Sequence, residues 1–378
     1  MDYYTYDFNP PAPPPPAPRE PRILGKLVLS AVLGASLALG ALFGIESFAG
    51  GEAPAALADP VPAVEAMPAI SVMAEEYSPS AVGEAVIPAV VTVEIGRQTS
   101  GGVMAQGSGS GVIIDSTGYI VTNDHVAGDA VSLRVVLSDG RIYEASLVGT
   151  DPVTDLAVLD IDADDLTAVE FGSTDGMVVG DTAIAVGNPL GLKGGPSLTV
   201  GVLSAVGREV QTSSTSILYG MLQTDAPITQ GSRGGALVDG AGRLIGITTA
   251  VGVSEVGIEG IGFATPIEIV RRVVDDLLVD GAVAHALLGI NGSTDFAATD
   301  DGGTRPIGVL VEAIEPASAA DVAGLQLGDV ITSIEGIDVD TMDELISALR
   351  RLGAGDLVGL EILRGGVTVE IQGTLGTL

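Results

Sequence analysis

The residues that could carry chemistry are few, because the chain of 378 residues has two histidines, His125 and His285, and no cysteine. Without cysteine there are no disulfides, no thiolate nucleophile and no zinc–thiolate site. Two histidines also argue against a histidine-rich metal site, and the sequence shows no cofactor or metal motif. The chemistry to consider is therefore that of an imidazole acting together with carboxylates and hydroxyls.

One glycine-rich segment contains a hydroxyl and a guanidinium side by side, in Gly231-Ser232-Arg233-Gly234-Gly235. A serine hydroxyl is a poor nucleophile until a neighbouring imidazole accepts its proton, and a buried carboxylate can fix that imidazole's tautomer. The guanidinium of Arg233 has no lone pair to offer as a nucleophile and stays protonated at any accessible pH. Which of the two side chains faces an imidazole therefore decides the chemistry.

The elements that would position these groups are mostly strands. From about residue 79 the sequence consists of short β-type runs separated by glycine and turn pairs. The runs 132–137 and 142–148 flank Ser-Asp-Gly-Arg and predict a hairpin, and a similar signal recurs over 237–247. Many short strands without intervening helices indicate a barrel or a sandwich.

A single clear helix ends this β-rich region. Thr265 can cap it, Pro266 takes the first helical position and Glu268 completes a capping box ahead of a periodic apolar stripe. We expect this helix to close the domain near Gly281.

The last 95 or so residues predict a smaller mixed unit. Strands are expected at 309–314 and 329–334, with a short helix at 316–323 that Gly324 stops. A further helix follows Thr341, which can cap it in a capping box with Glu344. The pattern predicts a small α+β domain.

The N-terminal part is organised differently. Residues 1–22 are rich in proline, which predicts a cytoplasmic tail of polyproline II character. Residues 23–45 contain 19 consecutive uncharged residues after basic ones, which predicts a transmembrane anchor with its N-terminus inside and the rest of the chain extracytoplasmic. A cleaved signal peptide is the alternative. Residues 46–78 predict a flexible linker.

Net charge excludes one class of partner. The chain has 49 acidic and 16 basic residues, a formal net charge of −33. Because phosphate binding needs clustered lysine and arginine, we expect no nucleic acid partner.

Five motifs occur in order between Gly107 and Ala205. They are Gly107-Ser-Gly-Ser-Gly-Val-Ile-Ile-Asp115, Gly118-Tyr-Ile-Val-Thr-Asn-Asp-His125-Val126, Asp151-Pro-Val-Thr-Asp155-Leu-Ala-Val158, Ala185-Val-Gly-Asn-Pro189 and Thr199-Val-Gly-Val-Leu-Ser-Ala205. Together they resemble the HtrA/Deg family of trypsin-like serine proteases. Leu287-Leu-Gly-Ile290 with Gly324-Leu-Gln-Leu-Gly-Asp329-Val-Ile331 is similar to the PDZ domain that follows the protease domain in that family.

The resemblance implies a mainly β fold: a trypsin/chymotrypsin-like double β-barrel over 79–283, followed by a small α+β PDZ domain over 284–378. It implies that His125 is the general base and that Asp155, 30 residues later, orients it. Arg233 then stands at the position of the nucleophilic serine, and Ser232 precedes it. The backbone N–H groups of Gly231 and residue 233 would form the oxyanion hole.

Four expectations concern side chains near these positions. Asp124 is expected to face solvent, and His285, in the hinge between the domains, to be incidental. Arg233 is expected to pair with Asp155 or another nearby carboxylate, or to project over the site of the scissile carbonyl. Ser232 could replace the nucleophile only if its loop were remodelled, because adjacent side chains point in different directions.

The PDZ resemblance implies peptide binding. A peptide's C-terminal segment would add as a strand, with its carboxylate held by the loop Leu287, Leu288, Gly289 and Ile290. The helix from Met342 to Leu352 would form the other wall.

Two functions follow from these features. The first is a membrane-anchored, catalytically inactive HtrA-like protein of protein quality control that binds unfolded proteins or peptide C-termini. The alternative is an active HtrA-like serine endopeptidase that degrades misfolded proteins. The family resemblance also implies a homo-oligomer, in HtrA-like proteases a trimer or a larger cage.

Overall fold

The structure, a computed structural model, describes residues 78–378 except 100–101, 189–194, 213–215 and 252–259. The predicted tail and anchor, and all but the last residue of the predicted linker, lie outside the described residues. Within the described part of the chain, no helix has the length and hydrophobicity needed to cross a bilayer. The described residues belong to one compact unit.

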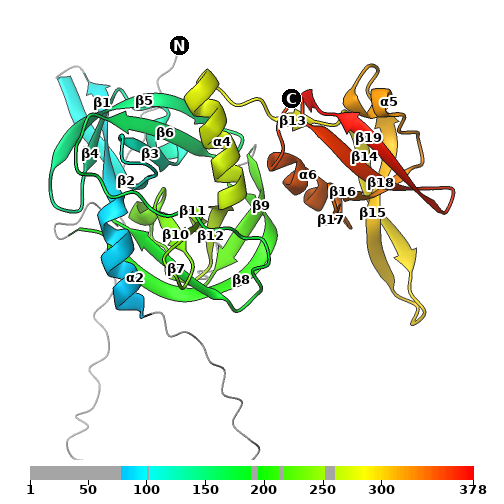
Figure 1. Ribbon diagram of the computed structural model, residues 1–378, viewed down its shortest axis with the longest axis horizontal. Helices are drawn as coiled ribbons and strands as arrows, with labels where there is room; N and C mark the ends of the chain where they lie inside the picture. Colours follow the sequence, from blue (N-terminus) through cyan, green and yellow to red (C-terminus); the bar gives the residue numbers. More distant parts are fainter. Residues whose placement is uncertain (1–77, 100–101, 189–194, 213–215, 252–259) are drawn as a thin grey trace, which may run out of the picture. The chain divides into compact units, whose positions relative to one another are not determined.

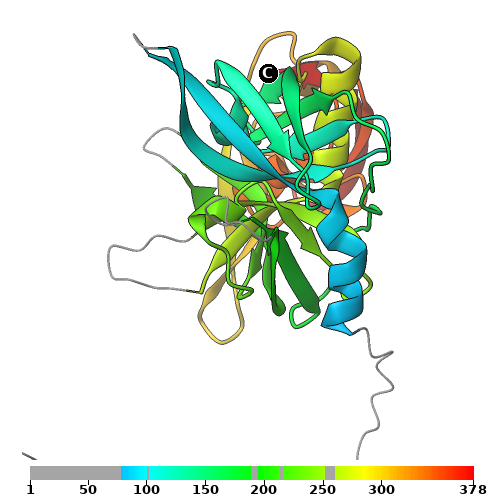
Figure 2. The ribbon, with the colours of Figure 1, turned by 90° about the vertical axis from the view of Figure 1, so that its left-hand side faces the viewer.

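Two closed six-stranded barrels form the larger domain and lie one above the other (Figures 1 and 2). The first has the order β1-β2-β3-β6-β5-β4 and the second β10-β11-β12-β9-β8-β7. The strands of the first are β1 (Val90–Thr99), β2 (Gly102–Ile113), β3 (Tyr119–Thr122), β4 (Ser132–Val136), β5 (Ile142–Asp151) and β6 (Leu156–Ile161). Those of the second are β7 (Thr182–Gly187), β8 (Ser197–Gln211), β9 (Ile217–Thr224), β10 (Ala236–Val238), β11 (Leu244–Val251) and β12 (Gly262–Pro266).

Alternating side chains fill the barrels. In β4, Leu133 and Val135 are buried while Arg134 between them is exposed, as expected when one face of a strand faces a core. Both predicted hairpins are confirmed. Val136 pairs with Ile142 across the first, and Val238 pairs with Leu244 across the second.

A core between the barrels joins them to two helices. It contains residues of both barrels together with the apolar faces of α2 (Pro79–Val86), which leads through η1 (Ile87–Ala89) into β1, and of α4 (Ile267–Asp280). Helix α4 also contacts β5 and β6 of the first barrel. Because one continuous core spans both barrels, loops that leave different barrels are held in fixed positions relative to each other.

The predicted start of α4 was wrong by one residue. Pro266 is its N-cap, Thr265 belongs to β12, and no side chain caps the helix. Glu268 cannot complete a capping box, because its carboxylate accepts hydrogen bonds from the N–H of Thr174 at 2.7 Å and from its hydroxyl at 2.6 Å. The predicted end is confirmed, since Gly281 terminates the helix at φ +70°.

The smaller domain is a sheet of order β14-β15-β16-β18-β19 with two short helices and a separate pair of short strands. Its elements are β13 (Ala286–Leu287), β14 (Ile290–Ala298), β15 (Thr304–Ile314), α5 (Ala319–Ala323), β16 (Val330–Ile334), β17 (Ile337–Asp338), α6 (Met342–Arg350), β18 (Leu357–Arg364), β19 (Val367–Thr374) and β20 (Gly376–Thr377). The predicted strands at 309–314 and 329–334 correspond to the second part of β15 and to β16.

The helices of this domain match the prediction in part. The capping box of α6 is confirmed: the Thr341 hydroxyl accepts from the N–H of Glu344 at 3.3 Å, and the Glu344 carboxylate accepts from the N–H of Thr341 at 3.0 Å. Helix α5 begins three residues later than predicted, because Ala317 has φ +61° and Ser318 is the N-cap.

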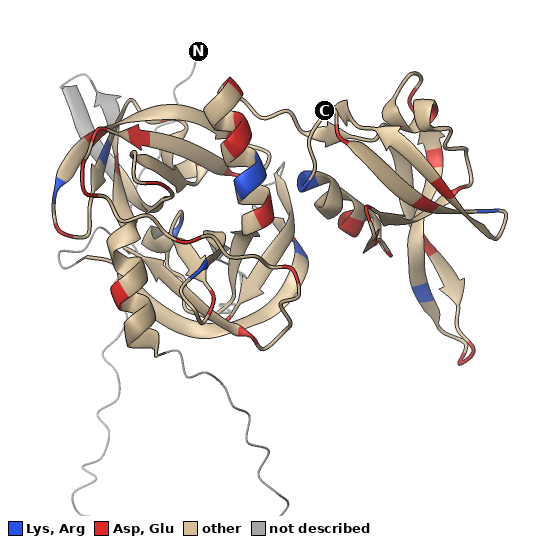
Figure 3. Cartoon of the chain, in the orientation of Figure 1, with Lys and Arg blue, Asp and Glu red and all other residues tan. Residues whose placement is uncertain are grey.

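Acidic residues occur on helices, strands and loops of both domains, with few basic residues among them (Figure 3). The net charge of −33 is therefore not confined to one described segment.

Candidate functional site

His125 and Asp155 are in direct contact, as the resemblance implies. His125 lies in α3 (Asp124–Ala127), one turn of helix after β3, and Asp155 in the turn between β5 and β6. The imidazole Nδ1 is 2.7 Å from Oδ2 and 2.9 Å from Oδ1 of Asp155, and the backbone N–H of His125 donates to Oδ1 at 3.0 Å. A carboxylate that accepts from Nδ1 leaves Nε2 as the proton acceptor. The imidazole side chain is 40% exposed.

Asp155 adopts an unusual backbone conformation, with φ +57°. A non-glycine residue in the left-handed region needs support from its surroundings. The buried Asn123 provides part of it, because its amide donates to the backbone carbonyl of Asp155 at 2.8 Å and to the Thr249 hydroxyl at 3.1 Å. Asn123 thereby connects the first barrel, through Asp155, to β11 of the second.

The loop that contains Arg233 lies against the same part of the first barrel. A Cβ placed on Gly109 of β2 would be 2.7 Å from the Val126 side chain and 3.3 Å from the Arg233 carbonyl. That carbonyl accepts from the N–H of Ser110 at 2.8 Å. Gly234, at φ +83°, has no room for a side chain, since its Cβ would lie 2.4 Å from the Thr122 hydroxyl. The packing therefore brings Arg233 next to the short helix of His125.

The Arg233 side chain makes no ion pair with any described carboxylate, so the expected pairing with Asp155 or a neighbour is not formed. Its Nε is buried and has no hydrogen-bond partner among the described residues. A buried guanidinium nitrogen without a partner carries a desolvation cost.

Ser232 packs against the second barrel. Ser232 is the last residue of the 3₁₀ turn η3 (Gln230–Ser232), and its N–H donates to the carbonyl of Thr229 at 2.9 Å. The hydroxyls of Ser232 and Thr229 are 3.2 Å apart. A Cβ on Gly187 would lie 2.9 Å from the Cβ of Ser232, so this side chain packs on the end of β7. Within the described residues no hydrogen bond joins Ser232 to His125.

Ser110 of β2 fixes Gly231, the residue before Ser232. The Ser110 hydroxyl donates to the Gly231 carbonyl at 2.9 Å and accepts from the N–H of Asn188 at 2.8 Å. The expected oxyanion hole, formed by the N–H groups of Gly231 and Arg233, stays a prediction.

Two expectations about neighbouring side chains were wrong. Asp124 does not face solvent but is half-buried, with its carboxyl folded back on α3 against Gly128. Burial and the nearby Asp155 raise its pKa. His285 is not incidental, because its imidazole is 9% exposed and Nε2 lies 2.8 Å from Oδ1 of Asp151. The one sequence feature that pointed to this pair is Asp151, the acidic residue at the start of the motif that ends in Asp155.

The predicted peptide-binding loop lies at the start of an edge strand. Strand β14 pairs only with β15 within its sheet, and α6 contacts it. The carbonyls of Leu288 and Gly289 accept from the N–H groups of Ala320 at 2.9 Å and Glu315 at 2.9 Å. Described peptide bonds are all trans, so the N–H groups of Gly289 and Ile290 point the opposite way from these carbonyls.

Gly289 is required by its surroundings. It has φ +79°, and a Cβ there would lie 2.3 Å from the Cβ of Ser318. The loop and the N-cap residue of α5 are therefore in close contact.

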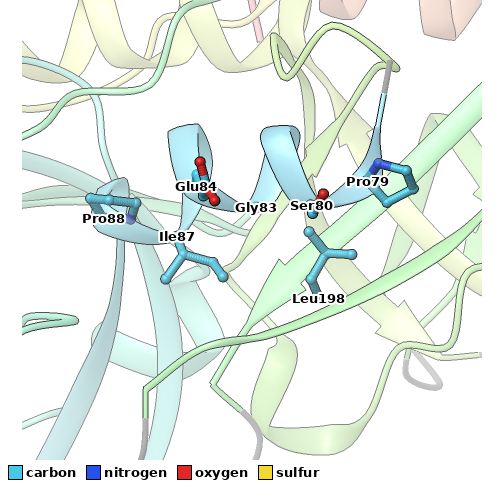
Figure 4. A pocket seen from close by; sticks show the side chains of 7 residues that line it. All are labelled: Pro79, Ser80, Gly83, Glu84, Ile87, Pro88 and Leu198. Atoms are coloured by element: carbon cyan, nitrogen blue, oxygen red, sulfur yellow. The ribbon is translucent and has the colours of Figure 1, made fainter. Parts of the chain in front are cut away.

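A separate groove of about 510 Å³ lies between α2 and β8 (Figure 4). Pro79, Ile87 and Leu198 make it mainly apolar, and Glu84 is its one ionisable residue. It contains none of the predicted catalytic or peptide-binding residues.

Comparison with known proteins matches both domains. Residues 109–247 match the trypsin-like peptidase domain family and residues 283–375 the PDZ domain family. The chain is 37% identical over 319 residues to the periplasmic pH-dependent serine endoprotease DegQ of Escherichia coli, covering 78% of this chain and 69% of that one. It is 40% identical over 269 residues to a probable periplasmic serine endoprotease DegP-like of Chlamydia trachomatis, of whose length it spans about half (53%).

A solved structure agrees with these matches. The HtrA-type protease AlgW with decapeptide aligns with a TM-score of 0.60 and 32% identity, over 80% of this chain and 99% of that one.

Proposed function

Because the chain belongs to the HtrA family of trypsin-like serine proteases with a C-terminal PDZ domain, we propose that it is a catalytically inactive member that binds peptides in protein quality control outside the cytoplasm. The observation that carries this proposal is Arg233, next to the short helix of His125, in the segment where the family has its nucleophile. His125 and Asp155 are in contact, and in this proposal the third group of a catalytic triad, the nucleophilic hydroxyl, is missing.

Arginine at that position removes the reaction rather than weakening it. Guanidinium has no lone pair for attack on a carbonyl and does not deprotonate in proteins. Loss of the nucleophile from a serine protease triad lowers kcat by about 10⁶-fold. Ser232 does not replace it, since its side chain packs on Gly187 and its hydroxyl is within hydrogen-bond distance of Thr229.

Peptide binding is supported by the edge of β14. An extended peptide can add to an unpaired strand edge, and its terminal carboxylate needs backbone N–H donors at the end of that edge. The N–H groups of Gly289 and Ile290 have that position and direction. Helix α6 lies beside the strand and supplies the opposite wall.

Location and assembly follow from the relatives and from the N-terminal sequence. Curated relatives are described as periplasmic, and we place both domains of this chain outside the cytoplasmic membrane. Residues 23–45 serve as a single-pass anchor in this proposal, with residues 1–22 inside. We further propose a homo-oligomer, a trimer by family resemblance.

The test of inactivity uses unfolded casein with the full-length chain and its Arg233→Ser variant. We expect no peptide release by the natural chain and release by the variant, abolished again when His125→Ala is added. Cleavage by the natural chain that depends on Ser232 would establish the alternative, an active endopeptidase. An inactive Arg233→Ser variant would show that more than the nucleophile has been lost.

Peptide binding is tested separately by fluorescence polarisation, because it does not depend on catalysis. A peptide with a free C-terminal carboxylate is expected to bind, and the same peptide with a C-terminal amide to bind at least about tenfold more weakly. Equal binding of the two peptides would contradict recognition by the loop at Gly289.

A further inference from the structure

The chain's two histidines contact the two ends of one turn. Asp155, at the end of the turn, accepts from His125, and Asp151, at its beginning, lies 2.8 Å from Nε2 of His285. The first pair belongs to the candidate site. The second pair is buried, with side chains that are 9% and 4% exposed, and the proposed function makes no use of it.

Asp151 organises the turn from within. Its Oδ2 accepts from the Thr154 hydroxyl at 2.5 Å, and its Oδ1 accepts from the N–H of Val153 at 3.2 Å. Thr154 is buried and immediately precedes Asp155. The Asp151 carboxylate is thus hydrogen-bonded to the residue that directly precedes Asp155, whose backbone is held at φ +57°. A left-handed aspartate keeps that conformation only while its neighbours are fixed.

His285 holds Asp151 from a segment that is itself fixed at the backbone. The His285 carbonyl accepts from the N–H of Leu378 at 2.9 Å, and the residue forms an isolated bridge with Gly353. Its side chain therefore joins the segment after α4 to the turn of the first barrel, while its backbone belongs with the C-terminal domain.

The charged groups around the pair come from three helices. Asp124 of α3 and Arg350 of α6 act electrostatically on Asp151. Arg272 and Asp276 of α4 bond the backbone of Ala284, next to His285. Burial raises the pKa of Asp151, but the hydrogen bonds from His285 and Thr154 outweigh it, and the pKa lies below its ordinary value. Asp151 is therefore a carboxylate in the folded chain and can accept from both partners.

We propose that His285 is a positioning residue for the His125–Asp155 pair: by holding Asp151, it fixes the turn that presents the Asp155 carboxylate to Nδ1 of His125. The chain of contacts runs from His285 through Asp151 and Thr154 to Asp155. It goes beyond the proposed function, because it concerns the geometry of the pair whether or not Arg233 blocks catalysis.

The test is a proton NMR measurement on the full-length chain with ¹⁵N-labelled histidine. An imidazole Nδ1–H that donates to a carboxylate gives a low-field signal, and His125→Ala identifies it. We expect this signal in the natural chain, its loss by exchange in His285→Gln, and its return in His285→Arg. Arginine restores it because guanidinium can donate to the Asp151 carboxylate. A signal unchanged in His285→Gln would overturn the proposal.

A second variant covers the case in which His285→Gln does not fold. Thr154→Val is nearly isosteric and leaves His285 on Asp151 while removing the contact from Asp151 to the residue before Asp155. It is expected to lose the His125 signal as well, and a retained signal would overturn the proposal. Asp139→Asn, in the exposed hairpin, is the matched control. Loss of the His125 signal in Asp139→Asn would also overturn the proposal, because the signal would then not depend specifically on the turn from Asp151 to Asp155.

Discussion

Gly187, at the end of β7, lies against Ser232, which precedes the neighbouring strand β10: a Cβ on Gly187 would lie 2.9 Å from both Cα and Cβ of Ser232. The backbone of Ser232 cannot yield without moving the loop of Arg233. We therefore predict that Gly187→Ala lowers the free energy of unfolding by about 1–3 kcal/mol, the usual cost of overpacking. Chemical denaturation measures this.

The matched control is Gly240→Ala in the neighbouring hairpin. A Cβ there would meet Thr182 at 3.6 Å, an ordinary contact distance. We expect the control to change stability by less than about 0.5 kcal/mol. Equal destabilisation by the two alanines would mean that the contact with Ser232 is not tight.

Asp151 predicts a pH dependence of stability. Its pKa in the folded chain is below the ordinary value of 3.8, so near that pH the unfolded chain binds more protons than the folded one. The contribution of Asp151 is therefore present above pH 3.8 and is lost as the pH falls through the folded value. Unfolding by urea at a series of acidic pH values should show stability rising with pH.

The variant Asp151→Asn isolates that contribution. It removes the charge from a buried pair and is expected to cost about 3–5 kcal/mol near neutral pH. The slope of stability against pH should also become shallower in the acidic range. If the variant kept the full slope of the natural chain, other carboxylates would account for it.

The fold could be predicted from sequence because its signals are local. Hairpin turns at 138–141 and 239–243 and the capping box of Thr341 depend on neighbouring residues, and all three are present. The capping box of Thr265 failed because a distant segment decides it: Glu268 bonds Thr174, 94 residues away in sequence. No pattern within the helix indicates that contact.

In the candidate site, too, residues in local motifs could be predicted from the sequence, whereas contacts between distant segments could not. His125 and Asp155 were found because their motifs are sequential and match a family. The contact of His285 was missed because its partner Asp151 is 134 residues away and no local motif surrounds the histidine. The orientation of Ser232 was inferred from the direction of adjacent side chains, whereas its contact with Gly187 required the fold.

In the C-terminal domain, the buried carboxylate of Asp329 depends on Arg364 for its side-chain hydrogen bonds, so we predict that loss of this arginine lowers stability. Asp329 is 1% exposed, and Arg364 donates to it through Nε at 2.8 Å and Nη2 at 2.7 Å. Hydrogen bonds from Arg364 lower the pKa of Asp329. Arg364→Ala would leave the carboxylate without its partner, so we expect this variant to unfold at a lower temperature than the natural chain. Thermal unfolding of the chain measures the loss.

Arg364→Lys separates charge from geometry. Lysine keeps the charge but cannot form the two parallel hydrogen bonds, so we expect an intermediate loss. Arg305→Ala, on the exposed end of β15, serves as the control and should be near neutral. Equal stability of the lysine variant and the natural chain would show that charge alone suffices.

Gly289 predicts a loss of peptide binding on substitution. In Gly289→Ala the new methyl would lie 2.3 Å from the Cβ of Ser318, and the residue would have to keep φ +79°. The loop must therefore move away from α5, which displaces the N–H groups of Gly289 and Ile290. We expect affinity for a peptide with a free C-terminal carboxylate to fall at least about tenfold, by 1.4 kcal/mol or more.

Gly324→Ala distinguishes the clash from backbone strain, because Gly324 also has a left-handed conformation, at φ +81°, but nothing within 4 Å of its Cβ position. It should lower stability modestly and leave peptide affinity unchanged. Adding Ser318→Gly to Gly289→Ala removes the atom that the methyl would meet and should recover part of the affinity. If Gly289→Ala bound the peptide as tightly as the natural chain, the carboxylate would have to be held elsewhere than at this loop.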